Sequence, residues 1–207
     1  MKIAKPKISK YLEQVNLTKD MVKTDLVDKE INMQEIDFVI EGIQFNGCKF
    51  TNVDFSKIPF RDVDLIDCIF EKCNLSGCDF TNRGIHRVIF NKCNMVGCNF
   101  ILSSLNDVSI LETKANYINF SDSKIKHFII NNSIIKEGRF VSTKFEDVCF
   151  NEVDLEASEF LNTKLKNIDF SNCNIVDIGV NHNDIRGIIV NEEQALMLIS
   201  LFGIVVK

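Results

Sequence analysis

An apolar residue stands at every fifth position from Ile40 to Val190, without a change of phase over 31 consecutive positions. In a chain that is 45% apolar, chance gives such a run with a probability on the order of 10^-11. A helix repeats about every 3.6 residues and a strand about every two, so neither requires a five-residue repeat. The pattern therefore predicts a coil that turns a corner every five residues, with the repeating apolar side chain inside.

The five-residue unit has a constant composition around this apolar position, which we call i. The i−2 site is small or apolar at 29 of the 31 repeats, the exceptions being Arg83 and Asn183. Asp or Asn is frequent at i−1, and i+1 and i+2 are mostly polar or glycine. Small i−2 residues suit a narrow interior, so we expect Arg83 to turn outward or to distort its corner.

The eight cysteines follow the same beat and are spaced by five rather than by the shorter interval of a zinc knuckle. Seven of them occupy i−2, a site that otherwise holds Val, Ile, Ser or Thr. The favoured interpretation is buried small apolar side chains, with metal or redox use as the alternative. Free thiols in a chain whose first residues contain no apolar leader segment predict a reducing, cytoplasmic location.

The unit, seen in CNLSG, CDFTN and IDFSN, resembles the A(D/N)LXX consensus of pentapeptide-repeat proteins over about three quarters of the chain. That family implies an all-β fold, a right-handed quadrilateral β-helix with four repeats per coil. Grouping every fourth repeat supports this, because Phe gathers in two of the four resulting columns. The predicted core comprises Phe60, Phe80, Phe100, Phe120, Phe140 and Phe160 in one column, and Phe70, Phe90, Phe150 and Phe170 in the other.

Three segments are predicted along the chain: an N-terminal cap over residues 1–35, the β-helix over 36–190, and a C-terminal helix and strand over 191–207. Asn191 and Gln194 have the spacing of a helix capping box, and Ile204–Val206 is the predicted strand. The apolar tail either folds onto the last coil or also forms a two-fold homodimer interface. The expected interface residues are Leu198, Ile199, Leu201, Phe202, Ile204, Val205 and Val206.

Charge is unevenly distributed in this chain of net charge −5. Residues 141–207 hold 5 basic and 11 acidic residues, an excess that a tail-to-tail dimer would double. The excess is either ordinary solubility charge or a DNA-like surface that occupies a basic DNA-binding saddle. The candidate residues are Asp154, Glu156 and Asp177 on one face, Glu152 at its edge, and Glu159 and Asp169 on other faces.

Several functions are disfavoured by the sequence. A net acidic chain argues against direct nucleic-acid binding, which needs a basic patch. No apolar stretch is long enough for a membrane span of about 18 residues. His86, His127 and His182 sit at polar corner positions without a repeated Ser, Cys or Asp partner, so we expect surface residues, no catalytic site, no metal and no cofactor.

The tail carries a second resemblance. Asp184–Gly187, Glu193–Leu196 and Leu201–Val205 resemble the ending of Qnr-type quinolone-resistance proteins, a family of dimeric rods. The resemblance implies a non-enzymatic DNA mimic that binds DNA gyrase and topoisomerase IV and protects them from quinolones. The alternative is a scaffold or regulatory module that binds another protein through apolar surface side chains. Candidates for that surface are Ile66, Ile69, Ile101, Leu102, Ile129, Ile134 and Leu161.

Overall fold

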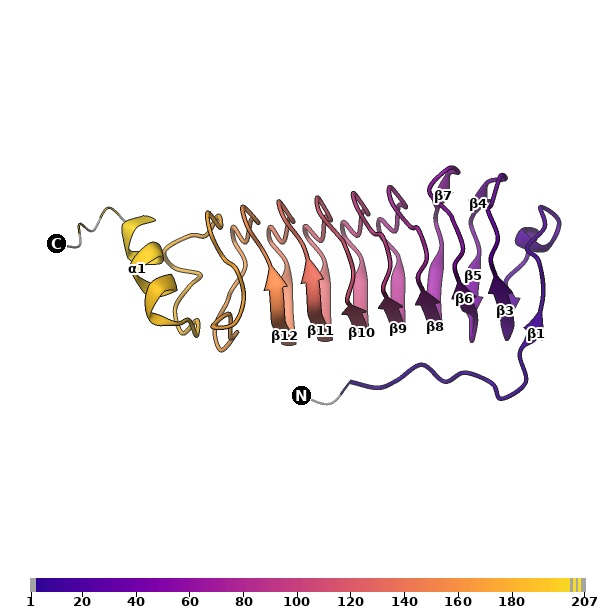
Figure 1. Ribbon diagram of the computed structural model, residues 1–207, viewed down its shortest axis with the longest axis horizontal. Helices are drawn as coiled ribbons and strands as arrows, with labels where there is room; N and C mark the ends of the chain where they lie inside the picture. The colour runs from indigo at the N-terminus through magenta and orange to yellow at the C-terminus, as the bar shows by residue number, and fades with distance from the viewer. Residues whose placement is uncertain (1–2, 202, 204, 206–207) are drawn as a thin grey trace.

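The computed structural model describes residues 3–201, 203 and 205, and they form a rod of about seven stacked coils (Figure 1). This confirms the predicted β-helix. The first elements are β1 (Glu13–Gln14), η1 (Met21–Lys23), β2 (Leu26–Val27), β3 (Lys29–Asn32), β4 (Ile40–Glu41), β5 (Gln44–Asn46), β6 (Lys49–Thr51) and β7 (Phe60–Arg61). Longer strands follow: β8 (Asp64–Glu71), β9 (Gly84–Asn91), β10 (Ser104–Leu111), β11 (Lys124–Ile134) and β12 (Lys144–Asp154), and then helix α1 (Glu192–Leu201).

Strand pairing is parallel and, from β4 onward, links residues 20 apart, as in Leu105 with Ile125 and Ile110 with Ile130. This register confirms four repeats per coil. Most strands belong to one sheet in the order β1-β3-β6-β8-β9-β10-β11-β12, with β2 and β5 beside it, and β4 pairs with β7 separately. We name the four faces by one coil: the Phe120, Ile125, Ile130 and Ile135 faces, each with its equivalents 20 residues away.

The polar positions of the repeat have a backbone explanation. Most residues at i+2 adopt a left-handed conformation, with φ of 53° at Asn52 and 57° at Asn82. Asn, Asp and Gly tolerate that conformation best, which accounts for their frequency there. Side chains at i−1 accept from the amide of i+1, as Asp79 Oδ1 does from Thr81 N at 2.9 Å. Asx turns of this kind form at several corners where Asp or Asn occupies i−1.

All the predicted core phenylalanines are buried, with at most 2% of any side chain exposed. The rings of Phe80, Phe100, Phe120, Phe140 and Phe160 stack with centroid distances of 4.8–5.3 Å. Seven cysteines are also buried, and Cys149, the one outside the i−2 position, is half-buried. Burial raises the pKa of the Cys98 thiol, as expected for a small apolar core residue.

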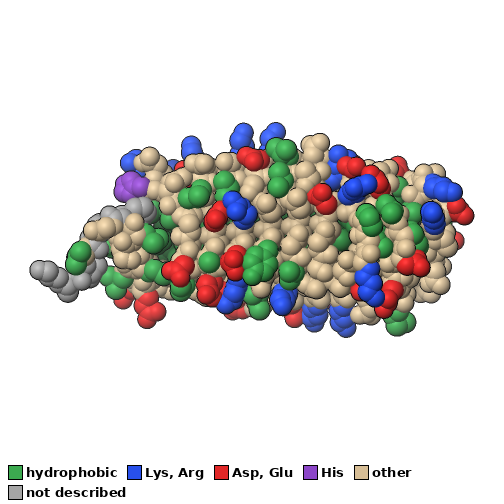
Figure 2. Space-filling view, turned by 90° about the horizontal axis from the view of Figure 1, so that it is seen from above, with side chains coloured by type: hydrophobic (Ala, Val, Ile, Leu, Met, Phe, Trp, Pro, Cys, Tyr) green, Lys and Arg blue, Asp and Glu red, His purple; other side chains and the backbone are tan. Residues whose placement is uncertain are grey.

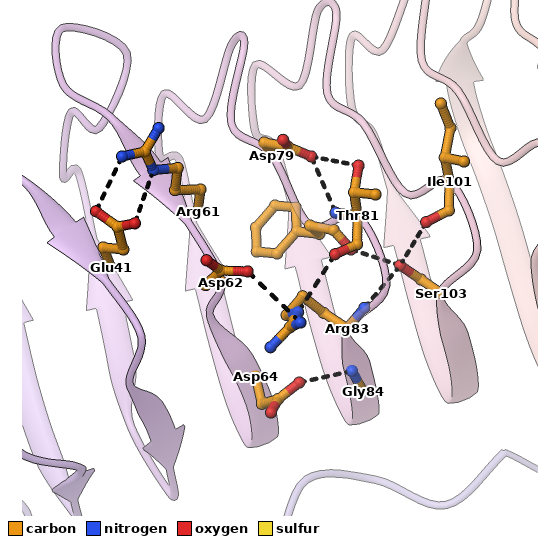
Figure 3. Close-up of polar contacts among 11 residues, drawn as sticks. Glu41, Arg61, Asp62, Asp64, Asp79, Thr81, Arg83, Gly84, Ile101 and Ser103 are labelled. Carbon is orange, nitrogen blue, oxygen red and sulfur yellow. Dashed lines mark hydrogen bonds and ion pairs between the residues drawn. The ribbon is translucent and has the colours of Figure 1, made fainter.

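Arg83 turns outward, which is one of the two outcomes expected for it (Figure 3). Its Nε donates to the carbonyl oxygen of Thr81 at 3.3 Å, and a guanidinium nitrogen lies 3.5 Å from Asp62 Oδ1. The Arg83 amide donates to Ser103 Oγ at 3.1 Å, so the backbone stays bonded to the next coil. The Arg83 side chain therefore leaves the interior, while the backbone hydrogen bond between the two coils is kept.

Both ends of the rod carry added structure. Residues 26–32 already form strands of the main sheet, and the preceding arm runs back beside the coils (Figure 1). At the other end, Asn191 and Gln194 cap α1 reciprocally, each side chain accepting from the other's amide at 2.9 Å. This confirms the predicted capping box. Val205 is not in a strand; Ile204 and Val206 lie outside the described residues.

Candidate partner-binding surface

The six predicted acidic residues lie where the coil register puts them, on three faces of the C-terminal third. Asp154, Glu156 and Asp177 are on the Ile135 face, whereas Glu159 is on the Phe120 face. Glu152 and Asp169 belong to the Ile130 face, with Glu152 at the corner that adjoins the Ile135 face. The structure therefore spreads them around the rod rather than gathering them on one side.

Three of these carboxylates are paired with basic residues one coil earlier. Lys136 Nζ lies 3.2 Å from Asp154 and 2.5 Å from Glu156, and Arg139 lies 3.0 Å from Glu159. These partners, 20 residues before Glu156 and Glu159, were not considered in the sequence analysis. The spacing itself is the signal that identifies them, since stacked positions differ by 20.

The other three, Glu152, Asp169 and Asp177, are exposed and have no ion pair within the described part of the chain. Hydrogen bonds from the Ser171 hydroxyl and amide lower the pKa of Asp169, so its charge is secure at neutral pH. The face drawn in Figure 2 shows acidic and basic side chains interspersed. Among the six candidates, these three residues therefore carry the uncompensated negative charge.

The predicted dimer residues divide into two groups. Leu198 is 5% exposed and packs in the core cluster, so it holds α1 against the rod. Gln194 Nε2 strengthens this attachment by donating to the carbonyls of Phe170 and Cys173 at 2.9 and 2.7 Å. Ile199 is half-buried, whereas Leu201 and Val205 are exposed. Phe202, Ile204 and Val206 lie outside the described residues.

A charged column along one corner was missed by the sequence analysis. Asp67, Arg87, Asp107, His127 and Asp147 occupy the same corner of successive coils. Arg87 donates to both oxygens of Asp67, at 2.5 and 2.6 Å. His127 lies 3.5 Å from both Asp107 and Asp147, so it is not a lone surface histidine as predicted. The alternating charges 20 residues apart could have revealed this column.

The N-terminal arm docks on this column. The amide of Lys7 donates to Asp67 Oδ1 at 2.8 Å, and the amide of Ala4 donates to Asp107 Oδ1 at 2.9 Å. Burial raises the pKa of Asp67, but bonds from Arg87 and the Lys7 amide outweigh it and hold the pKa below its usual value. Ile3, Ala4 and Ile129 line a groove between the arm and the Ile130 face.

The apolar surface candidates do not form one patch. Leu102 and Ile134 are exposed, whereas Ile129 adjoins the arm. The rest, Ile66, Ile69, Ile101 and Leu161, are half-buried and lie on three different faces. Among the described residues, no group of His, Cys, Asp and Glu is arranged to hold a metal ion. In the same part of the chain, no helix has the length and apolar character needed to cross a membrane.

These features define a parallel β-solenoid with four-sided coils and a capped C-terminal end. Two sequence models of pentapeptide repeats match the chain: one, of eight repeat copies, over residues 43–82, and one, of a pentapeptide repeat region, over residues 63–140. The chain is a pentapeptide-repeat protein. No curated protein sequence matches it significantly.

Solved structures of similar proteins include two trypsin-treated variants of QnrB1, a plasmid-mediated fluoroquinolone resistance protein. One is 20% identical, with 94% of this chain and 95% of that chain covered and a TM-score of 0.39. The other is also 20% identical, with 89% and 99% covered and a TM-score of 0.35. HetL, a pentapeptide repeat protein involved in heterocyst differentiation regulation from the cyanobacterium Nostoc sp. strain PCC 7120, is 11% identical, with 81% and 90% covered and a TM-score of 0.34.

Proposed function

We propose that this protein binds bacterial type II topoisomerases, DNA gyrase and topoisomerase IV, as a non-enzymatic mimic of DNA. The observation that carries the proposal is the exposed, unpaired set of Glu152, Asp169 and Asp177 close to the C-terminal end of the rod. Carboxylates on successive coils present negative charge at intervals along a rigid rod, and a basic DNA-binding saddle attracts such a surface. The resemblance of the tail to Qnr-type proteins supports this partner.

A homodimer through the C-terminal end would lengthen the acidic surface. The apolar side chains of Leu196 and Leu201 are 52% and 49% exposed on α1, while Leu198 on the same helix is buried. A helix with apolar residues outside its own packing face is typical of an interface. We expect Leu196→Lys with Leu201→Lys to give a monomer by light scattering, with α1 still folded by circular dichroism. If the wild-type protein already has the mass of a monomer, and the variant has the same mass, the proposed dimer is wrong.

Supercoiling by purified gyrase, with and without ciprofloxacin, tests the function directly. We expect the protein to bind gyrase and to restore supercoiling in the presence of the drug. Inhibition without rescue would indicate a DNA mimic that lacks the protective step. No effect in either assay, together with no binding, would overturn the topoisomerase proposal and favour the scaffold alternative.

Two variants with equal charge change locate the surface. Replacing Glu152, Asp169 and Asp177 by their amides removes unpaired charges, and we expect gyrase binding to weaken about tenfold. The matched control replaces Asp154, Glu156 and Glu159 by their amides, which releases Lys136 and Arg139. Since those carboxylates are compensated in the free protein, their loss is expected to weaken binding about threefold or less. Equal losses in both variants would show that net charge, not this surface, drives binding.

A further inference from the structure

The ladder of backbone hydrogen bonds between coils is interrupted after β12 on two faces. The amides of Ser104, Lys124 and Lys144 each donate to the preceding coil at 2.9 Å. Lys164 occupies the equivalent position, yet no backbone hydrogen bond joins 144–152 to 164–172 within the described residues. The bonds resume at Leu165, whose amide donates to the following coil at 2.9 Å. The outer edge of β12 is therefore a free sheet edge.

A crevice lies along this edge. Its volume is about 370 Å³, and its lining includes Phe145, Val148, Lys164 and Lys166. Phe145 and Val148 are half-buried, whereas their counterparts one coil earlier, Ile125 and Phe128, are 1% and 0% exposed. The gap between coils thus exposes interior apolar side chains together with unpaired backbone groups.

Four lysines at or near the crevice form no ion pair within the described residues. Lys124, Lys144 and Lys164 stand at the same position in three successive coils, and Lys166 is beside Lys164. All four are exposed, and none has a carboxylate within ion-pair distance among the described residues. Two nearby acids have partners of their own: Glu146 lies 2.5 Å from Lys126, and Asp147, which also lines the crevice, lies 3.5 Å from His127. Glu152 and Asp169, on the Ile130 face, form no ion pair in the described part of the chain. Stacked like charges are unfavourable, so this column is suited to an anionic ligand.

We propose that this crevice binds an extended acidic segment of a partner protein, which adds as a strand to the edge of β12. The free amides and carbonyls of the edge are complementary to another peptide backbone. Side chains of an added strand alternate between the outer surface, beside Lys144 and Lys164, and the interior, beside Phe145. The segment therefore has acidic residues at alternate positions with apolar residues between them. A nucleic acid could pair with the lysines through its phosphates, but it has no peptide backbone to pair with the free amides and carbonyls of the β12 edge.

This surface is on the Ile125 and Ile130 faces, and the Ile130 face also carries Glu152 and Asp169. The charge of its lysines is opposite to that of the topoisomerase-binding carboxylates. The proposal goes beyond the proposed function and does not depend on it. A failure of either leaves the other standing, because one requires acidic residues of this chain and the other requires its lysines.

Hydrogen exchange in the free protein tests the open edge with two matched pairs. Lys144 donates to the preceding coil and Lys164 does not. Glu112 donates to the following coil at 3.0 Å, whereas Glu152 has no such bond. We expect the amides of Lys164 and Glu152 to exchange at least about tenfold faster than those of Lys144 and Glu112. Equal protection within both pairs would show a closed ladder and overturn the proposal.

A labelled peptide tests binding. The probe is fluorescein-labelled acetyl-Glu-Val-Glu-Val-Glu-amide, and one control carries Lys in place of Glu. A second control is N-methylated at alternate residues, which removes strand pairing and keeps the charge. We expect both controls to bind at least about tenfold more weakly, and the probe to slow exchange at Glu152. Equal binding of the N-methylated peptide would overturn strand addition.

A charge-matched pair of variants locates the peptide. Lys144→Glu with Lys164→Glu is expected to weaken binding at least about tenfold. Lys19→Glu with Lys114→Glu makes the same charge change at exposed sites away from the crevice, and binding is expected to stay within about twofold. An equal loss of peptide affinity in both variants would show that the peptide does not bind at the crevice. Tighter binding of an oligothymidylate, lost in the crevice variant, would replace the acidic peptide by a nucleic acid.

Discussion

Replacement of Phe120 by alanine is expected to lower the free energy of unfolding by about 3–5 kcal/mol. The ring of Phe120 is fully buried and lies between Phe100 and Phe140, with centroids 5.0 and 5.3 Å away. Its removal leaves a cavity in the centre of the column and ends both stacking contacts. Because each coil packs only on its neighbours, no distant part of the rod can close over the gap.

Urea unfolding followed by circular dichroism measures this loss. The control is Met95→Leu, a volume-conserving change at another fully buried i position, for which we expect less than about 1.5 kcal/mol. A Phe120→Ala protein no less stable than the Met95→Leu protein would contradict the role of the stacked column.

Arg87→Met is expected to destabilise the protein by about 3 kcal/mol at neutral pH, because it leaves the Asp67 carboxylate buried without its cation. The Asp67 side chain is only 8% exposed and Arg87 only 18%. The double variant Asp67→Asn with Arg87→Met is expected to lose less free energy of unfolding than Arg87→Met alone, because it leaves no uncompensated buried charge. A double variant as unstable as Arg87→Met alone would show that packing, not charge, is responsible.

The effect of Arg87→Met also depends on pH. In the folded wild-type protein the pKa of Asp67 is below its usual value, so this group stabilises the fold above its unfolded pKa, and that contribution is lost as the pH falls through the folded pKa. Without Arg87, burial dominates and the pKa of Asp67 is higher than in the wild type. The difference in stability between the two proteins is therefore expected to narrow on acidification. A difference that is constant from pH 7 to pH 3 would contradict this linkage.

The five-residue pattern predicts the interior of this protein well because one physical requirement governs it. Nearly all i and i−2 side chains face the same narrow core, so the burial of Phe140 or Cys98 follows from its position in the repeat. The same pattern marks Arg83 as a residue that must turn outward or distort its corner, and the structure has the outward turn. The capping of α1 by Asn191 and Gln194 is also local, and is visible in the sequence for that reason.

Features that depend on contact between coils were harder to predict. The pairing of Lys136 with Glu156 and the column from Asp67 to Asp147 require residues to be compared at intervals of 20. The docking of Ala4 and Lys7 uses backbone amides, which leave no trace in side-chain composition. Phe145 is in phase with the repeat, so nothing in the pattern marks the open edge of β12 beside it.

The open edge also makes the rod mechanically uneven. Elsewhere a pull along the long axis is resisted by hydrogen bonds on all sides of the coil, but after β12 the bonds of two faces are missing. The remaining links, such as Ser142 to Leu161 and Leu155 to Asn174, lie on the other two faces. Under tension we therefore expect the protein to yield first at this junction, with the C-terminal coils and α1 separating as one unit before the N-terminal coils unfold.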